Sequence, residues 1–102
     1  MNIQNQLFDA VYYGTDLEFK YNGNYYFIES GKTTQNTVNM HSITVFQSKE
    51  SFYEGSSDSK CEEVYSACQK NANENAHDLF EAKIFEGKSL CEIINDISNI
   101  NY

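Results

Sequence analysis

The first run of hydrophobic positions along the chain has the spacing of a helix. Ile3, Leu7, Ala10 and Val11 recur at i, i+4, i+7 and i+8, which places them on one face of an α-helix. Gly14 follows at the position where many helices end in a residue of left-handed conformation. The pattern predicts an amphipathic helix over residues 2–13.

A strand-like period follows this helix. Residues 16–21 alternate between polar and apolar side chains, and residues 25–28 form a second apolar run. Asn22 and Gly23 separate the two runs. Because both central residues of a type I′ turn need positive φ, Asn-Gly at this place predicts a β-hairpin.

A two-residue turn also determines which residues of the hairpin lie opposite each other. The expected pairs are Tyr21 with Asn24, Phe19 with Tyr26, and Leu17 with Ile28. One face of the hairpin is then apolar and suited to a core. The other face places Glu18 and Lys20 opposite two aromatic residues, so we expect it to be only partly covered.

The next stretch of the chain is polar. Residues 31–39 are rich in Thr and Asn and predict a loop, whereas residues 42–46 are mostly β-branched or aromatic and predict a third antiparallel strand. His41 directly precedes that strand, where we expect a solvent-facing edge position. Phe52 and Tyr53 are expected to anchor the following segment onto the sheet.

A helical pattern begins near residue 56 and ends near residue 70. Ser59 and Glu62 have the spacing of a capping box. The stripe that follows at i, i+3, i+4 and i+7 consists of Cys61, Val64, Tyr65 and Cys68.

Two more helices are expected toward the C-terminus. After a loop at residues 71–75, Asn75 is positioned to cap a short helix that Gly87 ends. Its apolar residues are Leu79, Phe80 and Ile84. Ser89 and Glu92 then form a second capping box. The apolar stripe of this last helix consists of Leu90, Ile93, Ile94 and Ile97.

These elements predict a single α+β domain over residues 1–102. It has an N-terminal helix, a three-stranded antiparallel sheet that contains the Tyr-Asn-Gly hairpin, and two or three C-terminal helices packed on one face. With 102 residues and 40% hydrophobic content, the chain can build one core and is too short for two.

The charge of the chain restricts its partners. Asp and Glu number 15, Lys and Arg together number 7, and the formal net charge is -8. A field of this sign repels nucleic-acid phosphates and anionic lipids, and it attracts basic protein surfaces. We therefore expect no direct binding to nucleic acid or membranes, and a basic protein surface as partner.

The cysteines favour a reducing compartment. Cys61, Cys68 and Cys91 are an odd number, which suits reduced, semi-buried thiols better than a disulfide framework. No apolar segment resembles a signal peptide or a membrane span. We expect a cytoplasmic protein.

Two segments match phosphate-loop patterns only superficially. Residues 82–89 fit the permissive form that ends in Gly-Lys-Ser, but Ile84 and Phe85 occupy its interior, where backbone N–H groups would have to face a phosphate. Residues 31–33 fit the pattern less well. We therefore interpret residues 82–89 as a turn and a helix start, and we expect no cofactor.

Metal and thiol chemistry have little support in the sequence. Cys61 and Cys68 are seven residues apart, a rise of roughly 10 Å on a helix, which is too far for one zinc ion. No local signature of a thiol hydrolase surrounds a cysteine, and His41 and His77 are the two histidines. We expect no metal site and no enzyme, and an enzyme that uses Cys and His is the third alternative.

The leading functional hypothesis rests on the carboxylates. Glu54, Asp58, Glu62 and Glu63 are the candidate partner-binding residues. They would bind a basic protein surface, or imitate a phosphate backbone and so block a basic host nuclease or DNA-binding protein. In the second hypothesis, acidity serves only solubility and the chain is a small accessory domain that self-associates as a homodimer.

Two segments also carry a family resemblance. Residues 17–28, with Tyr-Asn-Gly in the hairpin, and residues 78–94, with Gly-Lys-Ser-Leu-Cys-Glu-Ile, together cover about a third of the chain. They resemble small uncharacterised proteins of Firmicute mobile elements and phages. The resemblance implies a compact α+β domain and a genomic neighbourhood where small acidic inhibitors of defence nucleases also occur, and it assigns no functional residue.

Overall fold

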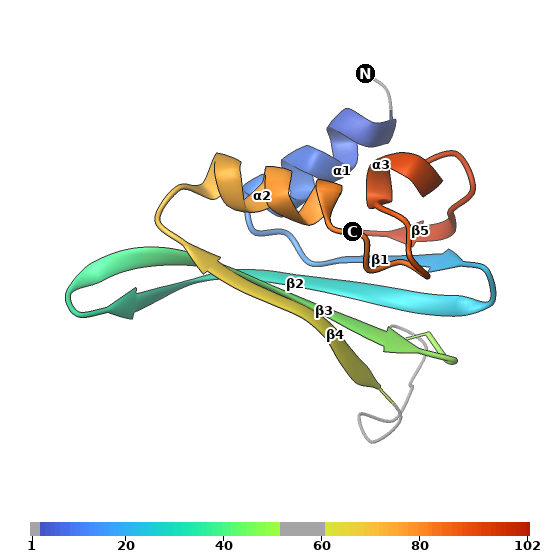
Figure 1. Cartoon of the computed structure of the whole chain (residues 1–102), viewed down its shortest axis with the longest axis horizontal. Coiled ribbons are helices and arrows are strands. Elements are labelled where there is room, and N and C mark those ends of the chain that lie inside the picture. The colour runs from blue at the N-terminus through green and yellow to red at the C-terminus, as the bar shows by residue number, and fades with distance from the viewer. Residues whose placement is uncertain (1–2, 52–60) are drawn as a thin grey trace.

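The structure is a computed structural model, which describes residues 3–51 and 61–102. In chain order the elements are α1 (Ile3–Tyr12), β1 (Leu17–Tyr21), β2 (Asn24–Gln35), β3 (Val38–Ser48), β4 (Glu62–Gln69), α2 (Ala72–Glu81), α3 (Leu90–Ile93) and β5 (Ser98–Asn101). The strands form one antiparallel sheet in the order β4-β3-β2-β1-β5. The helices lie together on one face of it (Figure 1). The α+β class is confirmed, with five described strands instead of three.

The first helix and the first hairpin follow the prediction. α1 buries three of the four residues expected on its apolar face, and Gly14 has a φ of +82°. The turn between β1 and β2 has positive φ at Asn22 (+50°) and at Gly23 (+84°), as a type I′ turn requires. All three predicted pairs are observed, with Phe19 opposite Tyr26 at the centre.

The predicted loop at residues 31–39 is wrong. β2 and β3 pair without a break as far as Gln35 and Val38, and the chain reverses at Asn36 and Thr37, which both have positive φ. The β-branched Thr residues fit a strand even where no core covers it, because the backbone ladder continues and polar side chains suit water on both faces. The tip of this hairpin extends beyond the helices (Figure 1).

The predicted helix over residues 56–70 is also wrong, because its second half is β4. Tyr65 pairs with Val45, and Ala67 pairs with Ile43, so the strand contributes to the core face with a period of two. Aromatic and β-branched residues favour strands wherever a neighbouring strand is available for pairing. The predicted capping residue Ser59 and the predicted sheet anchors Phe52 and Tyr53 lie outside the described residues.

The middle helix begins earlier than predicted. Asn71, not Asn75, is the N-cap of α2, and its side chain accepts a hydrogen bond of 3.0 Å from the backbone N–H of Glu74. Asn75 is buried inside the helix. Of the three apolar residues expected on this helix, Leu79 and Phe80 are buried. The helix ends at Glu81, before the expected Gly87, so Ile84 lies outside it and is half-buried. Among the described residues, no helix is long and apolar enough to cross a membrane.

The last helix is shorter than predicted. The capping box of Ser89 and Glu92 is confirmed, and Leu90 and Ile93 are fully buried. The helix ends after one turn, however, and its two later apolar residues are half-buried. The chain then forms β5, because β1 would otherwise be an open edge and its backbone groups bind this segment.

An aromatic cluster lies at the centre of the core. Phe85 is fully buried, with its ring centroid 4.9 Å from that of Tyr26 and 5.6 Å from that of Phe19. On the opposite face of the sheet, Glu18 is fully buried rather than partly wetted. The hydroxyl of Ser51 donates to its carboxylate over 2.8 Å, and this bond compensates the burial of a polar group.

Candidate functional site

Two of the four predicted partner-binding carboxylates can be placed in the structure. Glu62 and Glu63 are the first two residues of β4, and both are exposed. Glu54 and Asp58 lie outside the described residues. β4 is the outer strand of the sheet, and no other described strand pairs with its second side.

Three more carboxylates, which sequence reasoning did not single out as a site, lie beside this strand. Glu74, Asp78 and Glu81 are exposed and follow an i, i+4, i+7 spacing on α2, which places them on one helical face. The carboxylate of Asp78 accepts a hydrogen bond of 2.6 Å from the amide of Gln69. Because Gln69 ends β4, this bond directs the acidic face of α2 toward that strand.

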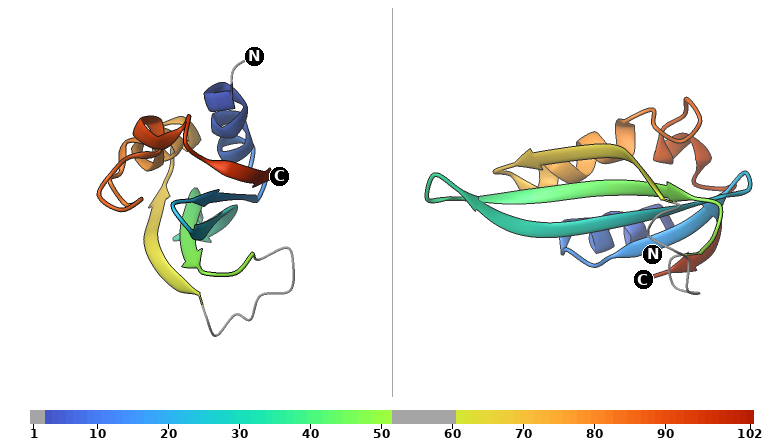
Figure 2. Two further views of the ribbon diagram at one scale, coloured as in Figure 1. Left: turned by 90° about the vertical axis from the view of Figure 1, so that its right-hand side faces the viewer. Right: turned by 90° about the horizontal axis from the view of Figure 1, so that it is seen from below.

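We call these five residues the acidic edge. Its members are Glu62, Glu63, Glu74, Asp78 and Glu81. β4 and α2 are in contact, and the Gln69 end of the strand is the end near the helix. Glu62 and Glu63 begin the strand at its other end, which points away from α2 (Figure 1 and Figure 2). Burial raises the pKa of Tyr65 on β4, and the negative charge of Asp78 raises it further.

The acidic edge is not neutralised by the described part of the chain. The ion pair formed between described residues joins Lys83 to Glu92 over 2.9 Å, and neither belongs to the edge. Hydrogen bonds from the Ser89 backbone, from Lys83 and from the Ser89 hydroxyl lower the pKa of Glu92 to about 2. The edge therefore presents carboxylates with no described basic neighbour within ion-pair distance.

The histidines and cysteines are spread over the molecule. His41 lies on β3 between two strands and is half-buried, so its predicted edge position is wrong. Its partner on β4 is Gln69. Because successive residues of a strand face opposite sides of a sheet, Cys68, which precedes Gln69, faces the side opposite to His41. His77 packs its ring against Phe8, with centroids 5.2 Å apart.

The exposure of the cysteines differs from the semi-buried set that the sequence predicted. Cys61 is half-buried, whereas Cys68 and Cys91 are exposed. The sulfur of Cys91 accepts a hydrogen bond of 3.6 Å from Gln4. Within residues 3–51 and 61–102, no group of three His, Cys, Asp or Glu side chains is placed to hold a metal ion.

Residues 82–89 form the turn and helix start that the sequence indicated. The backbone groups of Phe85 and Lys88 bond to each other at 3.0 and 3.1 Å, and the chain reverses between them. The Phe85 side chain fills the core instead of leaving room for a phosphate. The weaker pattern at residues 31–33 lies inside β2.

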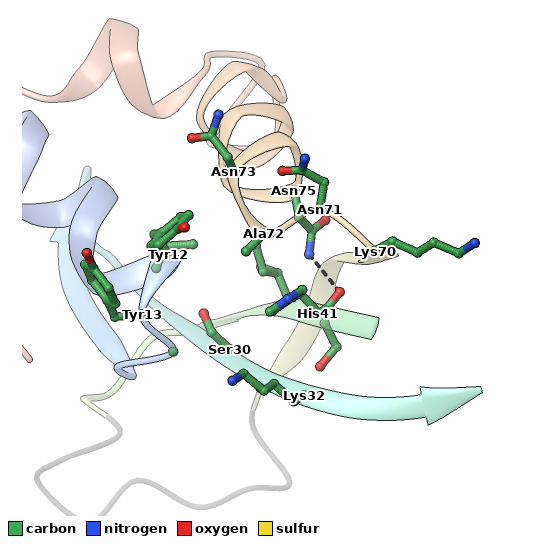
Figure 3. A pocket seen from close by; sticks show the side chains of 15 residues that line it. Tyr12, Tyr13, Ser30, Lys32, His41, Lys70, Asn71, Ala72, Asn73 and Asn75 are labelled. Atoms are coloured by element: carbon green, nitrogen blue, oxygen red, sulfur yellow. Dashed lines mark hydrogen bonds between the residues drawn. The ribbon is translucent and has the colours of Figure 1, made fainter. Parts of the chain in front are cut away.

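A cavity of about 620 Å³ lies where the ends of two helices meet the sheet. Tyr12 and Tyr13 at the end of α1 form one side, the first turn of α2 forms the other, and Ser30 and Lys32 of β2 lie below (Figure 3). Sequence reasoning missed this cavity, because its walls come from four segments far apart in the chain.

Two polar atoms at the cavity are buried without a partner. The Asn75 side chain is 1% exposed, and its amide nitrogen donates to the main-chain oxygen of His41 over 3.0 Å. Its amide oxygen and the hydroxyl of Ser30 bind no group in the described part of the chain. A buried polar atom that lacks a partner costs about 1 to 3 kcal/mol.

Comparison of the chain with protein-family models, curated proteins and solved structures found no match. The resemblance to proteins of mobile elements and phages therefore stays a prediction.

Proposed function

We propose that this chain is a non-enzymatic binding protein that docks on a basic protein surface through the acidic edge. The observation that carries the proposal is the set of five exposed carboxylates along β4 and α2, which no described Lys or His neutralises. Complementary charge accelerates encounter and selects the partner, and it acts without a deep pocket.

In its more specific form, the proposal makes the acidic edge a substitute for nucleic-acid phosphates. A basic host nuclease or DNA-binding protein is then the partner, and the edge occupies the groove that otherwise holds the phosphate backbone. A protein of net charge -8 is excluded from DNA itself by repulsion, and the same charge favours the protein that binds DNA.

Self-association through β4 is the second candidate function. The free side of this strand offers backbone donors and acceptors to another strand. A second copy would bring its own Glu62 and Glu63 to the same interface, and this repulsion opposes pairing at low salt. Sedimentation separates the two candidates, because self-association predicts a dimer that high salt strengthens.

The proposal is tested with a pair of variants that change net charge equally. The edge variant is E62Q/E63Q/E74Q/E81Q, which leaves the Asp78 hydrogen bond in place. The control variant is D9N/D16N/E29Q/D96N, at four exposed carboxylates elsewhere. Each protein is immobilised, and an extract of Firmicute cells is passed over it.

Retention of a basic protein by the wild type and the control variant, but not by the edge variant, supports the proposal. Equal retention by the edge and control variants would assign the effect to net charge alone. Release of the retained protein by DNA supports the phosphate-substitute form, and DNA that binds to the complex without displacing it contradicts that form.

A further inference from the structure

The cavity between α1 and α2 differs in charge from the rest of the molecule. None of the residues that line it is Asp or Glu, although the chain contains 15 of them. Lys32, Lys70 and His41 belong to the lining, and Lys32 lies along its lower side, whereas the Lys70 side chain extends outward (Figure 3). The lining therefore opposes a negatively charged ligand less than the acidic surface of the molecule does.

The first turn of α2 adds backbone donors to this cavity. A helix leaves its first N–H groups without intrahelical acceptors. The Asn71 side chain provides an acceptor for one of them, that of Glu74. Those of Ala72 and Asn73 bind no acceptor within the described residues, and both residues line the cavity. These donors and the helix dipole favour an anionic group.

Asn75 and Ser30 provide an independent indication of a ligand. Both line the cavity, and each keeps a buried oxygen atom without a partner. Asn75 is held against His41 by its other amide atom, so its oxygen is not free to find another partner by rotation. A ligand that donates a hydrogen bond, from a hydroxyl or an amino group, would satisfy this side of the cavity.

The wall opposite α2 is aromatic and exposed. Tyr13 is 76% exposed and Tyr12 is 40% exposed, and their ring centroids are 4.9 Å apart in an edge-to-face arrangement. An exposed tyrosine ring beside a polar cavity offers a stacking surface to another ring. The volume of about 620 Å³ lies within the range of sites for small molecules, roughly 300 to 1,000 Å³.

We propose that this cavity binds an aromatic organic phosphate of mononucleotide size. The phosphate lies against the N–H groups of Ala72 and Asn73 and the ammonium of Lys32, and the ring stacks on Tyr13. A sugar hydroxyl lies near Asn75. This site adjoins the acidic edge at Glu74, which lies between Asn73 and Asn75 on α2 but is not among the residues that line the cavity. The proposal does not depend on the function assigned to that edge.

Titration of the ¹⁵N-labelled protein with adenosine monophosphate tests the proposal. We expect saturable shifts of the backbone amides of residues 12–14, 30–32 and 71–75, with a dissociation constant below 1 mM. Adenosine and inorganic phosphate, each titrated alone, should bind at least tenfold more weakly. Absence of shifts at 10 mM adenosine monophosphate overturns the proposal without any variant.

Three variants then locate the ligand. Tyr13→Ala and Lys32→Gln should each weaken binding about tenfold, whereas Lys88→Gln removes an exposed lysine outside the lining and should leave it unchanged. The amide spectrum of each variant verifies the fold. If inorganic phosphate binds as tightly as adenosine monophosphate, the stacking part of the proposal is overturned. If all three variants lose the same affinity for adenosine monophosphate, the proposed location is overturned.

Discussion

Replacing Phe85 by alanine should lower the free energy of unfolding by about 3 to 5 kcal/mol. The ring is fully buried, and it contacts Phe19 and Tyr26 with centroids 5.6 and 4.9 Å away. The loss therefore combines the burial of a large side chain with two aromatic contacts. A domain of this size has about 5 to 15 kcal/mol in total, so the variant should be close to unfolding.

Urea denaturation followed by circular dichroism measures this loss. With an m-value of roughly 2 kcal/mol/M, the midpoint should fall by about 2 M. Phe85→Leu keeps much of the apolar volume and should lie between the wild type and Phe85→Ala. Tyr13→Ala, at a side chain that is 76% exposed, should stay within about 0.5 kcal/mol. A loss below about 1 kcal/mol for Phe85→Ala would refute the reasoning, because residues 82–89 would then not be held by the core.

Further predictions concern the turn, the last helix and one carboxylate. Gly23→Val puts a β-branched residue at a φ of +84° and should destabilise by roughly 1 kcal/mol or more, measured by the same denaturation. Ile93→Ala should cost about 2 to 5 kcal/mol and Ile94→Ala clearly less, because Ile93 is fully buried and Ile94 is half-buried; equal losses would contradict the short α3. The pKa of Glu92 is lowered from 4.5 to about 2, so its contribution to stability is complete above pH 4.5 and is lost as the pH falls toward 2. In Glu92→Gln, the free energy of unfolding should therefore change less between pH 4.5 and pH 2 than in the wild type. The same pH dependence in both proteins would show that Glu92 is not held by Ser89 and Lys83.

Local chemistry explains the parts of the fold that the sequence predicted correctly. Asn22 and Gly23 specify a turn by their own conformational preferences, and the register of β1 and β2 follows from the length of that turn. Ser89 and Glu92 likewise form their capping box from neighbouring residues. Other segments add contacts to both features, since the Asn22 amide donates a hydrogen bond to Glu86 and Lys83 binds Glu92.

Tertiary pairing decides the parts that were predicted wrongly. Val64 and Tyr65 fit a helical stripe and a strand equally well by spacing, and the open side of β3 selects the strand. The same holds for β5, which forms because β1 offers an open side. A pattern of apolar residues cannot reveal that a distant strand lacks a neighbour.

The candidate sites also contain one part that the sequence predicts and other parts that depend on tertiary contacts. The exposure of Glu62 and Glu63 was predictable from their charge, whereas the neighbouring carboxylates of α2 become part of the same edge only through the contact of Asp78 with Gln69. The cavity could not be predicted, although one signal was present. Asn75 lies four residues before the buried Leu79, so a helix that began at residue 72 would have placed a polar amide in the core.

The affinity of the retained basic protein for the wild-type chain and for the two charge variants tests the central claim most directly. Exposed charge pairs contribute roughly 0.2 to 1 kcal/mol each, so the four substitutions of E62Q/E63Q/E74Q/E81Q should weaken binding about fourfold or more at 0.1 M salt. D9N/D16N/E29Q/D96N should change it by less than about threefold, since those charges lie outside the edge and are screened beyond about 10 Å. Equal affinities for the edge variant and the wild type would contradict the assignment of the acidic edge as the binding surface.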